Sequence, residues 1–136
     1  MAGALAAIGA VATTVLLVSA PRPDATLVKT GDLPSVDALA LIEAEYFFAR
    51  IDGSSLRAHE GFEGWDIFAG SNAFGAPCLV AIAPTDDWVR IECTPQPAQL
   101  VADSHPYTQP DGPMIRFILH GDVVEAWVYP HVEAGQ

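Results

Sequence analysis

The tripeptide Asp103-Ser104-His105 places the three residue types of a hydrolytic triad next to one another. A serine nucleophile needs a histidine base and a carboxylate that orients this base, and the three groups must converge in space. Neighbouring residues of a strand point to opposite faces, so Ser104 would project away from Asp103 and His105. The sequence therefore favours a surface loop before Pro106, and a minor hydrolase that uses Asp103 and His105 ranks last among the functions considered.

Histidine and aspartate side chains could also ligate a metal ion. None of the histidines has the spacing of a known metal site, so we expect solvated polar residues at most of these positions. The weak candidates for ligands are Asp103, His105 and Asp111. Calcium is the favoured ion, because Asp86-Asp87 and Asp111-Gly112 place oxygen atoms on turns of an acidic domain. We expect no cofactor.

Length and charge exclude several classes of protein. The chain has 136 residues, the length of one domain, and 6 basic against 17 acidic side chains give a net charge of −11. Binding to a phosphate backbone needs clustered Lys and Arg, and the bases of this chain are isolated, so nucleic acid is not expected as a partner. The sequence contains no Gly-x-Ser-x-Gly, His-Glu-x-x-His or phosphate-binding glycine motif, which favours a function without catalysis.

An uncharged apolar segment extends from Ala2 to Ala20. As a helix it would be about 28 Å long, which is close to the roughly 30 Å of a bilayer's hydrocarbon core. We predict a retained transmembrane anchor over residues 1–20. A cleavable signal peptide is the alternative, although the apolar run is longer than usual for one and no basic residue precedes it.

Two patterns disagree about the side of the membrane. Arg22 and Lys29 follow the apolar segment, and the positive-inside rule alone would place the domain in the cytoplasm. A disulfide between Cys78 and Cys93 would instead require an oxidising compartment. We expect a single-pass protein of the cell membrane with its domain on the extracytoplasmic side.

The two cysteines flank a segment that is typical of a β-hairpin. Residues 84–87, Pro-Thr-Asp-Asp, have turn chemistry, and the residues on each side alternate as those of half-buried strands do. A turn centred between Thr85 and Asp86 creates three apolar pairs on one face: Cys78 with Cys93, Val80 with Ile91, and Ile82 with Val89. Directly opposed residues are close enough for a disulfide, so this register predicts one.

The other face of this hairpin carries Trp88, Arg90 and Glu92. An exposed tryptophan is costly without a partner, so these three residues form a candidate contact surface. For Trp88 the favoured alternative is a place in the core, under the proline-rich stretch 94–113.

Three further elements follow from periodicity. We predict a helix over Ser35–Arg50 with Ser35 as its cap, a strand over Gly64–Gly70, and an edge strand over Leu100–Ser104. Proline-rich residues 21–34 are typical of an extended linker.

A second hairpin is predicted from Met114 to Tyr129, around a two-residue turn at Gly121-Asp122. The register that centres on this turn opposes Ile115 to Val128, Phe117 to Ala126, and Leu119 to Val124. It also places Arg116 across from Trp127, where a cation–π pair could form.

These elements together predict an α+β, β-rich fold. An N-terminal membrane helix (1–20) and a linker (21–34) precede an extracytoplasmic domain (35–136). We expect this domain to contain one antiparallel sheet of roughly four to six strands, one packed helix and one disulfide.

The order of motifs from Trp65 to Pro95 resembles that of a loose group of short proteins of unknown function from high-GC Gram-positive bacteria. An aromatic–acidic strand and a glycine-rich turn precede Pro-Cys-Leu-Val-Ala, Asp-Asp-Trp and Glu-Cys-Thr-Pro. Proteins of this group have one membrane helix and a small extracytoplasmic domain with two cysteines. The resemblance, which also covers Ala2–Ala20, implies an external domain and no particular activity. The group usually carries Arg or Lys before the membrane helix, and this chain has neither there.

Two functions remain as hypotheses. The first is a non-enzymatic accessory or protein-interaction module, held by membrane lipid near a larger membrane protein complex or a cell-wall component. Small residues of the apolar segment (Gly3, Ala6, Ala7 and Ala10) have the spacing of a helix-packing face. The alternative is a domain that binds a small ligand or a calcium-like metal ion through its acidic loops.

Overall fold

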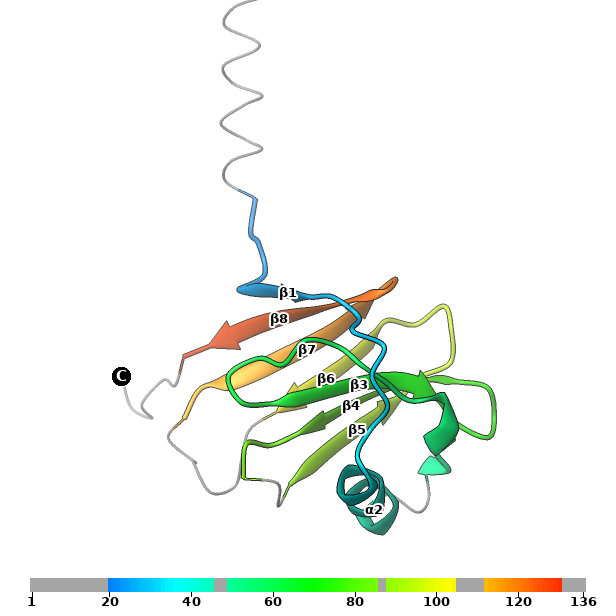
Figure 1. Cartoon of the computed structure of the whole chain (residues 1–136). Helices are drawn as coiled ribbons and strands as arrows, with labels where there is room; N and C mark the ends of the chain where they lie inside the picture. Colours follow the sequence, from blue (N-terminus) through cyan, green and yellow to red (C-terminus); the bar gives the residue numbers. More distant parts are fainter. Residues whose placement is uncertain (1–19, 46–48, 86–87, 105–111, 131–136) are drawn as a thin grey trace, which may run out of the picture.

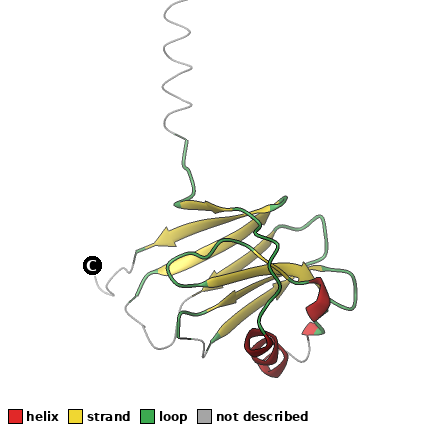
Figure 2. Ribbon diagram, in the orientation of Figure 1, coloured by secondary structure: helices red, strands yellow, loops and turns green. Residues whose placement is uncertain are grey.

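The domain is built from two stacked antiparallel sheets with one α-helix outside them (Figures 1 and 2). The computed structural model describes residues 20–45, 49–85, 88–104 and 112–130. A single sheet of four to six strands was the wrong expectation, because the described residues form eight strands in two four-stranded sheets. The β-rich α+β class, the helix and the disulfide are confirmed.

The first sheet has the strand order β1-β8-β7-β6 and the second has the order β2-β3-β4-β5. The strands of the first sheet are β1 (Ala25–Leu27), β6 (Leu100–Ser104), β7 (Met114–His120) and β8 (Val123–Tyr129). Those of the second sheet are β2 (Arg57–Ala58), β3 (Asp66–Ser71), β4 (Pro77–Ile82) and β5 (Val89–Cys93). The helices are α2 (Val36–Glu45) and the short 3-10 helix η2 (Gly53–Ser55).

Strand β4 explains why there are three layers. Every residue from Cys78 to Ile82 is buried, so both faces of this strand are covered. Leu79 and Ala81 belong to the core between the two sheets, together with Phe117 of β7. Val80 and Ile82 belong to a second core, which lies on the other face of the second sheet and includes Ile42 of α2. An apolar strand without polar alternation is therefore buried between a sheet and a helix.

The cysteine hairpin has the predicted register. Cys78 opposes Cys93, Val80 opposes Ile91 and Ile82 opposes Val89. The two sulfur atoms form a disulfide, and the Cα atoms of the two cysteines are 4.1 Å apart. The alternation of apolar residues and the cysteine spacing thus gave the correct pairing.

The second hairpin also has the predicted register, with Ile115 opposite Val128 and Phe117 opposite Ala126. Arg116 lies opposite Trp127 as expected. Its guanidinium carbon, however, lies over the ring of Tyr129, 5.6 Å from the ring centroid. The predicted cation–π pair therefore has a different aromatic partner, because the long arginine side chain reaches diagonally to the next residue on the same face of β8.

Helix α2 begins where the sequence predicts. The Ser35 hydroxyl oxygen accepts a hydrogen bond from the backbone N–H of Ala38, at 3.1 Å, which satisfies a free donor of the first turn. The predicted end at Arg50 is wrong, because Arg50 has a φ of 51° and therefore does not continue a right-handed helix. The described part of the helix ends at Glu45. Strands β3 and β6 occupy the predicted segments, and β3 is displaced by one or two residues.

The proline-rich segment is the main correction to the predicted organisation. Residues 24–32, which we call the strap, belong to the folded domain and join the edges of both sheets. Its first half pairs with β8, where Ala25 opposes Ala126. Its second half follows β2, where Lys29 bridges to His59 and the Thr30 N–H donates to the Ala58 carbonyl at 3.0 Å. Prolines flank the strap but do not interrupt it, which leaves its N–H groups free to donate.

The predicted anchor lies almost wholly outside the described residues, which begin at residue 20. Within the described ranges, no helix is both long enough and apolar enough to cross a membrane.

Candidate functional site

The candidate residue Asp103 belongs to an ion pair between two strands of the first sheet. Asp103 of β6 lies opposite Arg116 of β7. The Arg116 Nε donates to Asp103 Oδ1 at 2.6 Å and its Nη2 donates to Oδ2 at 2.9 Å. This two-point contact has the geometry that makes arginine–carboxylate pairs strong and directional. Both side chains keep well over a third of their surface exposed, so solvent weakens the attraction.

Electrostatics favour the charged form of both partners. Hydrogen bonding to Arg116 holds the pKa of the Asp103 carboxyl below its usual value, although partial burial opposes this effect. The positive charges of Arg116 and of Arg90 lower it further. The same hydrogen bond raises the pKa of Arg116. Asp103 is therefore a carboxylate whose oxygen atoms are already occupied, not a group poised to accept a proton.

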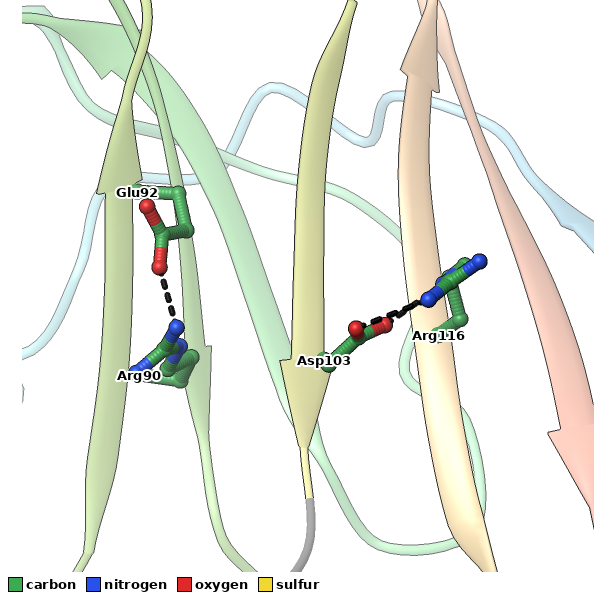
Figure 3. Close-up of polar contacts among 4 residues, drawn as sticks. All are labelled: Arg90, Glu92, Asp103 and Arg116. Atoms are coloured by element: carbon green, nitrogen blue, oxygen red, sulfur yellow. Dashed lines mark hydrogen bonds and ion pairs between the residues drawn. The ribbon is translucent and has the colours of Figure 1, made fainter.

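A second ion pair lies beside the first, on the neighbouring sheet. Arg90 and Glu92 of β5 form an ion pair, and Figure 3 shows the two pairs on adjacent strands. The four charges alternate in sign across β5, β6 and β7. The positive charge of Arg90 also lowers the pKa of Asp103. The two ion pairs therefore interact electrostatically where the edge strands β5 and β6 approach each other.

Trp88 of the predicted contact surface packs into the molecule. Its ring meets that of Trp65 edge to face, with 5.5 Å between the ring centroids, and it contacts the core between the sheets. The three predicted contact residues therefore lie in different surroundings. Trp88 is partly buried against the core, whereas Arg90 and Glu92 pair with each other at a sheet edge.

The triad residue types do not come together in the described structure. Ser104 is fully buried on the inner face of β6, and Asp103 is on the outer face with Arg116. His105 lies outside the described residues. The expected divergence of neighbouring strand residues thus separates the hydroxyl from the carboxylate.

The weak metal candidates are only partly described. Asp103 is engaged by Arg116, and His105 and Asp111 fall outside the described residues. Across the ranges that the structure covers, no three His, Cys, Asp or Glu side chains lie in a group that could hold an ion.

Sequence reasoning missed an exposed apolar surface at the start of α2. Leu33 and Val36 have 67% and 82% of their surface exposed. The same helix borders a hollow of about 500 Å³, the α2 hollow, whose lining residues are Ser35, Asp37, Ala38, Leu41, Asp66 and Ile82. The available signal was Val36, an apolar residue in the first turn that does not belong to the apolar stripe through Leu39 and Ile42.

A second hollow, of about 480 Å³, lies near the disulfide between the 95–99 loop, the β7–β8 turn and Pro77. Its polar lining comes from Gln96, Gln99 and His120.

Comparisons of this chain with known protein families, with curated proteins and with solved structures find no match.

Proposed function

We propose that this chain is a membrane-anchored extracytoplasmic accessory protein, which binds another protein and does not catalyse a reaction. The observation that carries the proposal is the disulfide between Cys78 and Cys93. A reducing cytosol keeps such thiols reduced, whereas compartments outside the cytoplasmic membrane preserve the bond. The uncharged segment Ala2–Ala20 supplies the anchor, and the resemblance to single-helix extracytoplasmic proteins supports the same placement.

The basic residues after the anchor are the argument against this placement. Arg22 and Lys29 would favour a cytoplasmic domain under the positive-inside rule. We give the disulfide more weight, because a covalent bond that closes a correctly paired hairpin depends directly on the redox state of the compartment. Two residues in a flank are a weaker bias.

The surface proposed to bind a partner protein is the exposed apolar pair Leu33 and Val36 at the start of α2. Both are among the most exposed large apolar side chains of the described structure. Exposed apolar side chains lose water when a partner covers them, and this loss of hydration favours binding. We propose that the partner is a subunit of a larger membrane protein complex or a cell-wall component.

The α2 hollow could alternatively admit a small ligand. Its volume of about 500 Å³ is within the range of ligand pockets, and Asp37 and Asp66 would favour a cationic one. Such a ligand would stabilise the folded domain and raise its melting temperature, which a screen of small cations and amines would detect.

The compartment is tested in intact cells. An epitope placed after Gln136 should be accessible to antibody on spheroplasts that have not been permeabilised. Cys78 and Cys93 should resist alkylation in membrane fractions until a reductant is added. Alkylation of both thiols before reduction, or an epitope that is reached only after lysis, would overturn the proposed placement.

The binding surface is tested with a photo-crosslinking amino acid at Val36. A control at Phe74 is well matched, because that side chain is 74% exposed and apolar but lies in the β3–β4 turn. We expect a discrete crosslinked product from position 36 and none from position 74. The same product from both positions, or none from position 36, would contradict the proposed surface.

A further inference from the structure

We infer that the β1 edge of the domain, where the strap begins, lies against the lipid headgroups and that the α2 hollow faces away from the bilayer. This inference rests on the proposed anchor in residues 1–20. It concerns the interaction surface of the domain, and it holds for either side of the membrane.

The chain between anchor and domain is very short. The domain already fixes Asp24, because its backbone N–H donates to the Ala126 carbonyl at 2.9 Å. The Asp24 carboxylate also accepts a hydrogen bond from the Val128 N–H at 2.7 Å. Only Pro21-Arg22-Pro23 remains as a tether, and fully extended it spans at most about 14 Å from Ala20 to Asp24. Two prolines also limit its flexibility.

The strap cannot lengthen this tether without breaking contacts with both sheets. Beyond Asp24, the strap pairs with β8 through Ala25, Thr26 and Leu27. It then bonds to the β2 edge, where the Ala58 N–H donates to the Asp32 carbonyl at 2.8 Å. Leu27 is buried in the core between the sheets. Release of the strap would therefore expose the core and two sheet edges. Because the strap stays bound, the tether stays short, and it limits how the domain can face the bilayer.

The polar headgroup region suits the exposed side chains around the tether. Arg22, Thr26, Val28 and Lys29 are exposed, and Val28 keeps 51% of its surface accessible. Two of the six Lys and Arg residues thus lie within eight positions of a chain whose net charge is −11. Their long side chains can bury apolar stems at the interface while the charged ends contact lipid phosphate.

The nearby acidic groups are held by backbone contacts. The Asp24 carboxylate accepts from the Val128 N–H, and the Glu60 carboxylate accepts from the Val28 N–H at 3.0 Å. Asp32 lies at the far end of the strap, away from the tether. Because these carboxylates keep their negative charge, attraction to lipid phosphate on this side depends on Arg22 and Lys29.

Helix α2 lies on the opposite side of the molecule. It packs on the face of the second sheet that is turned away from the first sheet. Packed layers are about 10 Å apart, so α2 is roughly 20 Å from the first sheet. Figure 1 shows the residues before β1 leaving the molecule at the β1 edge, with α2 at the far end. The α2 hollow is thus open to a partner that the bilayer does not block.

The test uses the full chain in phosphatidylcholine vesicles that contain a headgroup-spin-labelled lipid. A single trifluoromethyl-phenylalanine replaces Thr26 on the strap or Glu43 on α2, both of which are exposed. Because a nitroxide broadens only nearby nuclei, we expect the fluorine signal at position 26 to lose most of its intensity and that at position 43 to keep most of it. A twelve-residue Gly/Ser insertion between Pro23 and Asp24 should remove the difference.

The outcomes separate this inference from the proposed anchor. A chain that does not float with the vesicles refutes the anchor, and the orientation fails with it. A chain that floats but loses equal intensity at both positions, or more at position 43, refutes the orientation alone. A difference that survives the inserted linker would also overturn the argument, because it would not depend on tether length.

Discussion

Reduction of the Cys78–Cys93 disulfide should destabilise the domain by about 3 kcal/mol. The bond joins residues 15 positions apart, and closing a loop of this length restricts the unfolded chain by about that free energy. For a domain of about 100 residues, the loss corresponds to a decrease of roughly 12 °C in the melting temperature. Both states have the same side chains, so the difference reports the bond itself.

The assay compares thermal unfolding, followed by near-ultraviolet circular dichroism, of the oxidised chain and of the chain held in excess phosphine reductant. Mass spectrometry after alkylation verifies that both thiols are free. The double variant Cys78→Ala/Cys93→Ala should lose somewhat more stability than the reduced chain, because Cys78 is fully buried and alanine leaves a small void.

A loss below about 1 kcal/mol on full reduction would refute the reasoning. It would mean that the disulfide hardly restricts the conformations of the unfolded chain, so that closing the loop contributes little to stability. The extracytoplasmic placement would not be affected, because it depends on the presence of the bond and not on how much the bond stabilises the fold.

Three further predictions concern the polar and close-packed positions. Asp103→Asn should cost under about 1 kcal/mol at pH 7, because the pair with Arg116 is exposed. The lowered pKa of Asp103 means that this stabilisation is present above pH 4 and disappears as pH falls through the folded-state pKa, so the difference between the urea midpoints of the two proteins should shrink as the pH is lowered below 4. Gly70→Ala should destabilise by about 1–3 kcal/mol in urea unfolding, since a Cβ there would approach the Ser55 hydroxyl at 2.7 Å and Leu56 at 2.9 Å; an unchanged midpoint would contradict this. Calcium should not stabilise the domain through Asp103, because Arg116 occupies both Asp103 oxygens; a rise in the melting temperature that Asp103→Asn abolishes would show otherwise.

The sequence was sufficient to predict both hairpin registers, for a physical reason. Each hairpin has a recognisable turn and apolar residues at alternate positions, and a shift of one residue would move all of them to the wrong face. The opposed pairs Cys78–Cys93 and Phe117–Ala126 follow directly from this constraint.

The division into two sheets was not predicted, because each sheet has one edge strand that is too short to show a period. β1 has three residues and β2 has two. β1 pairs with β8, which is distant in sequence, and β2 pairs with β3 across a loop that lacks a tight-turn signal. One signal was available in the uninterrupted apolar run of β4, since burial on both faces implies a layer on each side.

The ion pair between Asp103 and Arg116 could not be derived for a related reason. It depends on the register between β6 and β7, and the long proline-rich connection between these strands does not fix that register as a tight turn would. The exposed surface at α2 was missed because helical periodicity identifies only the buried side of a helix. It does not predict the role of an apolar residue on the exposed side, such as Val36.

The strap has a practical consequence for preparing the domain. A fragment that begins at Ser35, after the proline-rich segment, would lack the strand that covers the outer edges of β8 and β2. Uncovered edges recruit strands from other molecules, so such a fragment should form insoluble or oligomeric material even though all of its own helices and hairpins are present. A soluble fragment needs to begin no later than Pro23.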